Sequence, residues 1–346
     1  MAQSLIAKPV PTLAASALVI SSYMPRWSSG PPTHRALEAA IEPQAPDLRT
    51  YGAFGLRIRS AIDLPELPDL EDDGSAVDLM IAWGRVESRL QGGVDVDAYM
   101  QVARDRFLLS VPAARYEVRN GRLILIDPRP GVSNRDVRLY LLGAVMTAVC
   151  HQRSLTPLHA TAIEVDAGAI AFAGPSGAGK STLAAQFQGR GVTVLADDLC
   201  VVRFDSAGRP WALPGLARIK LWGDSLAMVG LAGAPLPRIA DDIGKFSLAV
   251  PSVATCHPRP FDRIYILRPD ASERVEIHPV AGPEAVGALV GNIHRWPLAV
   301  AMGRATGCFD ACHALATQCK VFEIRFSHAA SAPLDVLQAV ERHWRG

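Results

Sequence analysis

The stretch Gly174-Pro-Ser-Gly-Ala-Gly179-Lys180-Ser181 matches G-x-x-x-x-G-K-[ST], the pattern of a phosphate-binding loop. Its glycines permit the backbone angles that let amide groups close around a phosphate. Residues 169–173 before the loop predict a strand, and residues 180–188 after it predict a helix whose free N–H groups point at the same anion. A chance match in this composition has a probability of about one in a hundred. The alternative, a glycine-rich turn with an incidental lysine, does not explain the flanking strand and helix.

Each residue of the loop has an expected task. Lys180 neutralises phosphate charge, and Ser181 offers a hydroxyl ligand to Mg²⁺. ATP and Mg²⁺ are therefore the expected cofactors. The expected nucleotide-binding residues are Gly174, Pro175, Ser176, Gly177, Ala178, Gly179, Lys180, Ser181 and Thr182.

An acidic pair and a histidine lie near the loop in the chain. Asp197 and Asp198 follow a predicted buried strand at residues 192–196, and ligands in α/β sheets bind at the carboxyl ends of strands. One carboxylate can hold Mg²⁺, and the other can accept a proton from an attacking hydroxyl. An isolated Asp-Asp pair is more often a turn or a helix cap, but its place behind a phosphate loop favours a site. His159 precedes the strand that leads toward the loop, and nothing local distinguishes it from a structural histidine.

Length, composition and charge limit the remaining function classes. The 346 residues are 49% hydrophobic, which allows two domains with separate cores. A net charge of +1 predicts no binding to nucleic acid or to an anionic membrane, and the apolar residues 13–20 are too few to span a bilayer. Six dispersed cysteines are typical of a reduced, cytoplasmic protein. A metal site at residues 308–319 is disfavoured, because that stretch lacks paired C-x-x-C ligands. Only five of the 35 basic residues are lysines, so a lysine at a site stands out.

The pattern along the chain predicts a small β region followed by an α/β region. We expect a flexible leader at 1–47, a mostly β domain at 48–134, a buried connecting helix at 135–154 and an ATP-binding α/β domain at 155–346. Asn120-Gly121 predicts a hairpin turn. Predicted strands cover residues 54–58, 77–83, 107–111, 116–118, 123–126, 161–165, 169–173, 192–196, 264–267, 275–278 and 321–326. Predicted helices cover residues 136–150, 180–188, 284–294, 298–318 and 334–344.

Taken together, these residues resemble the catalytic domain of HPr kinase/phosphorylase. The matching stretches are Leu158-His159-Ala-Thr-Ala, the phosphate loop and Leu195-Ala-Asp197-Asp198. His159 precedes Lys180 by 21 positions, and the two aspartates follow it by 17 and 18, which are that family's spacings. The resemblance implies a fold related to phosphoenolpyruvate carboxykinase. It also implies that Asp198 accepts the proton of a substrate serine, that His159 and Asp197 support the site and its metal, and that Ser181 is a metal ligand.

The resemblance weakens after about residue 205. The family's glycine-rich signature, with its glutamate metal ligand, falls at residues 214–224, where this chain has no glutamate and Asp224 is a candidate substitute. The candidates for a later family arginine are Arg259, Arg263 and Lys245. These departures disfavour HPr as the substrate and disfavour the reverse, phosphorylase reaction.

Residues 51–60, 64–68 and 141–143 resemble a branch of HPr-kinase-related proteins from lasso-peptide gene clusters, which phosphorylate a serine near the end of a precursor peptide. The expected function is therefore a kinase for a serine of a peptide or protein, and the family resemblance implies self-association into oligomers. A small-molecule kinase and a nucleotide-binding regulatory module without phosphotransfer remain open. An ATPase or transporter subunit is disfavoured, because its signature motif is missing between the loop and the acidic strand.

Overall fold

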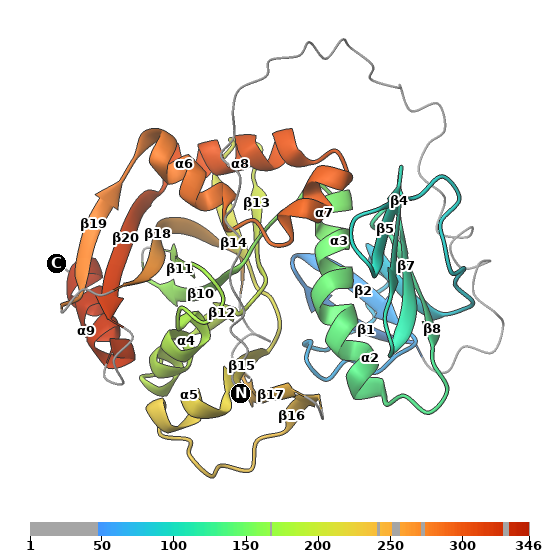
Figure 1. The fold of residues 1–346 in the computed structure, drawn as a ribbon, viewed down its shortest axis with the longest axis horizontal. Helices are drawn as coiled ribbons and strands as arrows, with labels where there is room; N and C mark the ends of the chain where they lie inside the picture. The colour runs from blue at the N-terminus through green and yellow to red at the C-terminus, as the bar shows by residue number, and fades with distance from the viewer. Residues whose placement is uncertain are drawn as a thin grey trace, which may run out of the picture.

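The computed structural model describes residues 48–166, 168–240, 243–250, 257–270, 274–327 and 332–345. The leader predicted for residues 1–47 lies outside the described residues. The chain is a mixed α/β protein with several sheets (Figure 1), and no described helix is long and apolar enough to cross a membrane.

The N-terminal part is one eight-stranded sheet with the order β1-β2-β3-β8-β7-β6-β5-β4. The pairs β2–β3 and β3–β8 are parallel, and the other neighbours are antiparallel. The strands are β1 (Arg49–Ala53), β2 (Leu56–Ser60), β3 (Leu79–Trp83), β4 (Val94–Asp95), β5 (Met100–Ala103), β6 (Arg106–Ser110), β7 (Ala114–Arg119) and β8 (Leu123–Pro128).

Two hairpins in this sheet test the expected turn chemistry. The hairpin predicted at Asn120-Gly121 is confirmed, since both residues have positive φ and join β7 to β8. The strand predicted at residues 54–58 is wrong at its start. Phe54 and Gly55, with φ of 56° and 68°, form a two-residue turn between β1 and β2.

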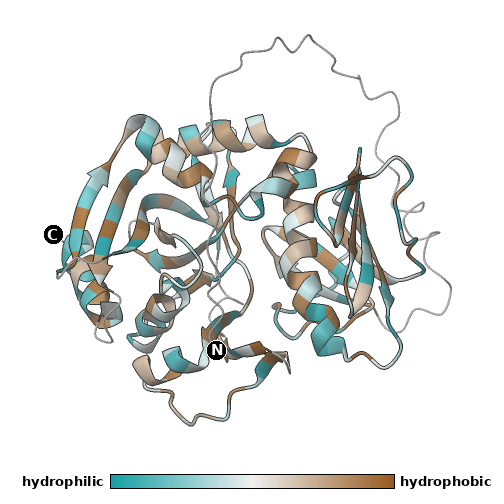
Figure 2. Cartoon of the chain, viewed as in Figure 1, coloured by the Kyte–Doolittle hydropathy of each residue, from teal (hydrophilic) through white to brown (hydrophobic). Residues whose placement is uncertain are grey.

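A helical segment follows the first sheet and packs on it. It consists of α2 (Asn134–Tyr140), a π-helical turn (Leu141–Val145) and α3 (Met146–Gln152). Together these three segments cover the buried helix that was predicted at residues 136–150. The Ser133 side chain caps its start by accepting the backbone N–H of Asp136. Figure 2 shows the segment changing from teal at α2 to brown and pale tones at α3.

One apolar core joins the two parts of the chain. It contains Ile58 and Phe107 of the first sheet, Val145 of the helical segment, and Val201 and Leu213 of the second sheet, all of them buried. The first sheet is therefore held to the rest of the chain by side-chain packing as well as by the connecting segment.

The central sheet runs in the order β12-β10-β11-β18-β14-β13-β9, and β20 pairs with β18 and β19. The pairs β11–β18 and β18–β20 are parallel. The strands are β9 (Thr156–Leu158), β10 (Ala160–Val165), β11 (Gly168–Ala173), β12 (Val194–Ala196), β13 (Cys200–Phe204), β14 (Pro210–Leu213), β18 (Arg259–Asp270), β19 (Glu276–Val280) and β20 (Lys320–Ser327).

Helices cover both faces of this sheet (Figure 1). Successive side chains of β11 point to opposite faces of the sheet. Its alanines join the core beneath α6 and α8, whereas Ile170 and Phe172 join the core beneath α4 and α9. The helices are α4 (Lys180–Gly189), α5 (Gly223–Met228), α6 (Gly282–Val290), α7 (Trp296–Ala301), α8 (Ala305–Gln318) and α9 (Ala332–Arg345).

Two helix predictions are wrong in extent. The helix predicted at 298–318 is divided into α7 and α8 around Gly303, whose φ is 67°. The helix predicted at 284–294 ends at Val290, so Asn292 and His294 lie in a connection. The second difference matters for the candidate site, because the connection after α6 crosses it.

A small third sheet, absent from the prediction, borders the phosphate loop. It has the order β15-β17-β16, with β15 (Arg218–Trp222), β16 (Arg238–Ala240) and β17 (Ile243–Ala249). Glu66 of the N-terminal part accepts hydrogen bonds from Arg138 of α2 at 3.0 Å and from Arg218 of β15 at 3.3 Å. One carboxylate thus connects the N-terminal part, the helical segment and the third sheet.

Candidate active site

The phosphate loop lies between β11 and α4, as predicted. Gly174, Gly177 and Gly179 all have positive φ, and a Cβ at Gly174 would lie only 2.8 Å from a backbone oxygen of Leu267. These positions therefore need glycine. The loop presents its amides and the N-terminus of α4 to one pocket.

Lys180, the first residue of α4, is buried and folded back onto the loop. Its ammonium donates to the backbone oxygens of Gly174 at 2.8 Å and Pro175 at 2.9 Å. Burial lowers the pKa of Lys180 to about 8, against the opposing effect of Asp197 and Asp198. An anion in the loop would favour the charged form of this lysine and raise its pKa again.

Asp197 directly follows the buried strand β12 and is only 3% exposed. Its Oδ1 accepts the hydroxyl protons of Thr161 at 2.6 Å and Ser181 at 2.8 Å. Its Oδ2 accepts the backbone N–H of Lys220 at 2.9 Å. The carboxylate thus fixes the start of α4 to the third sheet without itself lining the pocket.

Of the two expected Mg²⁺ ligands, only Ser181 lines the pocket. Its hydroxyl donates to Asp197 Oδ1 at 2.8 Å, so the buried carboxylate positions the serine oxygen. A hydroxyl oxygen is a ligand that Mg²⁺ accepts, and Asp197 could act on the ion through this serine or through water. Asp224, the suggested substitute for a missing glutamate ligand, is exposed and does not line the pocket.

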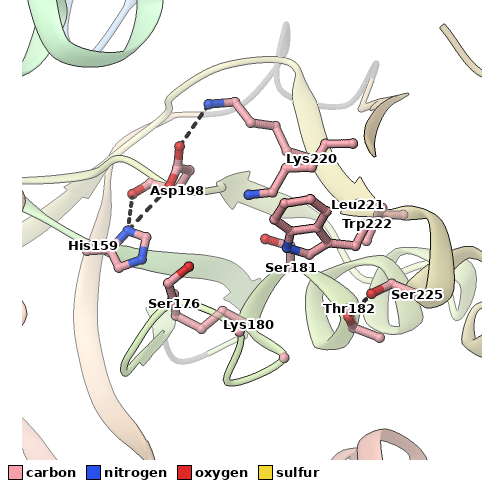
Figure 3. Close-up of a pocket in the computed structure, with 13 residues that line it drawn as sticks. His159, Ser176, Lys180, Ser181, Thr182, Asp198, Lys220, Leu221, Trp222 and Ser225 are labelled. Carbon is pink, nitrogen blue, oxygen red and sulfur yellow. Dashed lines mark hydrogen bonds and ion pairs between the residues drawn. The ribbon is translucent and has the colours of Figure 1, made fainter. Parts of the chain in front are cut away.

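Asp198 turns into the pocket because its backbone is left-handed, with φ of 70°. Its Oδ1 lies 3.3 Å from His159 Nδ1, and its Oδ2 lies 2.8 Å from Lys220 Nζ (Figure 3). Burial alone would raise the pKa of Asp198. The hydrogen bond from His159 and the charge of Lys220 outweigh burial and hold this pKa well below its usual value. The carboxylate is therefore ionised, with both oxygens engaged.

The connection after α6, which the prediction missed, supports both the loop and the histidine. Asn292 accepts the backbone N–H of Gly174 through its side chain at 2.7 Å and that of His159 through its own carbonyl at 2.7 Å. The ring of His294 lies 5.6 Å from that of His159. The only sequence signal for this connection was Gly291, which follows the last residue of α6.

The tautomer of His294 follows from its neighbours. The hydroxyl of Thr147 donates its one proton to the Gly143 carbonyl at 2.9 Å, so it accepts from Nδ1–H of His294 at 2.9 Å. Burial lowers the pKa of His294 to about 3, which keeps the ring neutral. Nε2 is left with a lone pair. Single ligand atoms of His159, Asp198 and His294 lie within 4.8 Å of one another, but the Lys220 ammonium on the same carboxylate opposes a metal ion there.

Lysines concentrate in the pocket. Of the five in the chain, Lys180, Lys220 and Lys245 line it. Lys245 Nζ lies 4.7 Å from the centre of the Trp222 ring, which is 48% exposed. Arg259 and Arg263, the other candidates for the family's later arginine, pair with Glu164 and Asp262 and do not line the pocket. The pocket residues are His159, Ser176, Gly177, Gly179, Lys180, Ser181, Thr182, Asp198, Lys220, Leu221, Trp222, Ser225 and Lys245.

Comparison with known proteins gives distant structural likenesses and no match to the sequence. No family model and no curated protein matches the sequence. Among solved structures, the chain matches that of the Hpr(Ser) kinase/phosphatase from Coxiella burnetii with a TM-score of 0.30 and 13% sequence identity, over 54% of this chain and 95% of that one. A likeness this distant leaves the function to be argued from the geometry of the site.

Proposed function

We propose that the protein is an ATP- and Mg²⁺-dependent kinase that phosphorylates a serine hydroxyl of a peptide or protein. The observation that carries this proposal is the Asp198 carboxylate, ionised and in the same pocket as the phosphate loop. A loop alone supports nucleotide binding. A carboxylate beside it adds an acceptor for the proton of an attacking hydroxyl.

Each residue then has a task in phosphoryl transfer. The loop amides and Lys180 hold the phosphates of ATP. Ser181 would hold Mg²⁺ directly and Asp197 would act through Ser181 or through water; when bound, the ion would neutralise phosphate charge. The substrate oxygen forms a bond to the γ-phosphorus as the bond to the β,γ-bridging oxygen breaks. Asp198 takes the hydroxyl proton, and ADP leaves. His159 holds Asp198 in position.

Two features bear on the size of the substrate. Trp222 is exposed at the pocket, and the sheet of residues 49–128 shares an apolar core with β13 and β14. Both features favour a substrate larger than a metabolite. The sequence resemblance suggests one candidate substrate, the precursor of a lasso peptide with a serine near its C-terminus. A fold related to phosphoenolpyruvate carboxykinase, a cytoplasmic location and self-association belong to the same proposal.

A regulatory module without phosphotransfer has one observation in its favour, because both oxygens of Asp198 are engaged. The test is incubation of the full chain with MgATP and synthetic peptides that end in serine, followed by mass spectrometry. We expect a phosphopeptide, none from the same peptide with alanine for serine, and at least a hundredfold lower rate for Asp198→Asn. ATP binding without any phosphopeptide would favour the regulatory module. Phosphate on metabolite hydroxyls alone would favour the small-molecule kinase. Full activity of Asp198→Asn would refute the role of the base.

A further inference from the structure

Lys220 holds both aspartates of the site. Its backbone N–H donates to Asp197 Oδ2 at 2.9 Å, and its ammonium pairs with Asp198 Oδ2 at 2.8 Å. The strand β15 keeps it in place through the pairing of Lys220 with Ser247 on β17. Its side chain is only 10% exposed, yet it lines the same pocket as the phosphate loop. A nearly buried lysine that faces a phosphate site calls for an explanation.

The ammonium has donors to spare. An ammonium carries three N–H donors, and within the described ranges the structure gives Lys220 Nζ one partner, Asp198. By contrast, the ammonium of Lys180 already donates to two carbonyl oxygens. Lys220 can therefore take a second anion at little cost in lost hydrogen bonds.

The present pairing also restrains the proposed base. With His159 on one oxygen and Lys220 on the other, each oxygen of Asp198 keeps one further lone pair for a substrate hydroxyl (Figure 3). A cation bound directly to a carboxylate, however, makes that carboxylate a weaker proton acceptor. Release of Asp198 by Lys220 would therefore strengthen the proposed base.

We propose that Lys220 is a γ-phosphate ligand, and that it moves from Asp198 to the γ-phosphate when ATP binds. This inference rests on the proposed function. The γ-phosphate carries more charge and more acceptor oxygens than one carboxylate, so it competes for the ammonium. The same movement that holds the phosphoryl group frees Oδ2 of Asp198 for the substrate hydroxyl. The base is therefore strongest when there is a phosphate to transfer.

The first test compares MgADP with the magnesium complex of adenosine 5′-(β,γ-imido)triphosphate by titration calorimetry. We expect the wild-type chain to prefer the triphosphate analogue. Lys220→Met should lose roughly tenfold of that preference while keeping its MgADP affinity, as expected for one lost charge-assisted contact. Lys220→Arg retains a cation and should retain most of the preference. Lys320→Met, on the exposed first residue of β20, is the matched control and should match the wild type.

The outcomes separate the two proposals. Failure of the wild type to bind either nucleotide would refute the proposed function. Binding of both nucleotides with the same preference in wild type and Lys220→Met would refute the role of Lys220 and leave the kinase proposal standing.

A second measurement needs no substitution at the site. Lysine labelled with ¹³C at Cε gives five signals in this chain, few enough to assign. We expect the Lys220 signal to shift with the triphosphate analogue and to stay near its free position with MgADP. Equal shifts with the two nucleotides, or no shift with either while both bind, would overturn the inference.

Discussion

The buried Lys180 makes nucleotide affinity depend on pH. In the free protein the pKa of this lysine is lowered to about 8 by burial, whereas a bound phosphate favours the ammonium and returns the pKa toward its ordinary value. Between about pH 7 and about pH 9, the charged fraction in the free protein falls from roughly nine-tenths to roughly one-tenth. The affinity for nucleotide is therefore highest below the pKa of Lys180 in the free protein. It falls about tenfold as the pH rises through that pKa from about 7 to about 9.

Titration calorimetry with MgADP measures this directly, because the phosphates of ADP are already ionised over most of the range. Repeating the titration in buffers of different ionisation enthalpy should reveal the uptake of about one proton near pH 9 and of about one-tenth near pH 7. Lys180→Arg is the control, since its guanidinium stays charged throughout and its weaker binding should not vary. A dissociation constant that changes less than twofold across the range, or binding without proton uptake, would refute the reasoning.

Three further predictions concern stability and can be measured by urea unfolding. Asn292→Ala leaves the Gly174 N–H without its acceptor and should cost about 1–3 kcal/mol; Asn292→Asp, which keeps an acceptor, should cost less, and equal losses would contradict this account. Neither Gly303→Ala nor Gly287→Ala places its new methyl group against another atom. Gly303→Ala should therefore destabilise by about 1–2 kcal/mol through its positive φ alone, whereas Gly287→Ala inside α6 should stabilise by about 0.5–1 kcal/mol. A change of the same sign in both variants would contradict this role of the backbone angle. Phe187→Ala should cost about 3–5 kcal/mol, because its ring is fully buried; a loss under about 1 kcal/mol would show that the core between the sheet and helices α4 and α9 repacks freely.

Local patterns predicted the parts of the site that are adjacent in the chain. The loop at residues 174–181 has its strand and helix because glycine spacing and apolar runs act over a few residues. Asp198 was predicted from its place after the buried strand behind the loop, and His159 from the family spacing relative to Lys180; the structure places both in the pocket with that lysine. Asp197 was expected beside them, but it lies beneath the pocket, hydrogen-bonded on both oxygens. Adjacent residues at a strand end can therefore take different tasks.

Long-range pairing explains what the sequence patterns missed. Lys220 comes into the pocket on β15, whose alternation over residues 218–221 was not predicted as a strand. Lys245, on the paired strand β17, was one of three candidates that local sequence did not separate. Asn292 lies 118 positions from the Gly174 amide that it holds. The apolar run through Gly303 continues the helical period, so only the backbone angle reveals the break. Such contacts depend on the assembled fold, and no local pattern specifies them.

The apolar core that joins the first sheet to the central sheet affects how this protein could diversify. Ile58 and Phe107 on one side meet Val201 and Leu213 on the other within a single packed cluster. A genetic exchange near about residue 130 would bring in a sheet whose side chains do not match the ones that they must pack against. The first sheet is therefore not a module that recombination can replace on its own. Substitutions on its inner face and on β13 and β14 must be compatible with one another, so these strands of the two sheets are expected to change together.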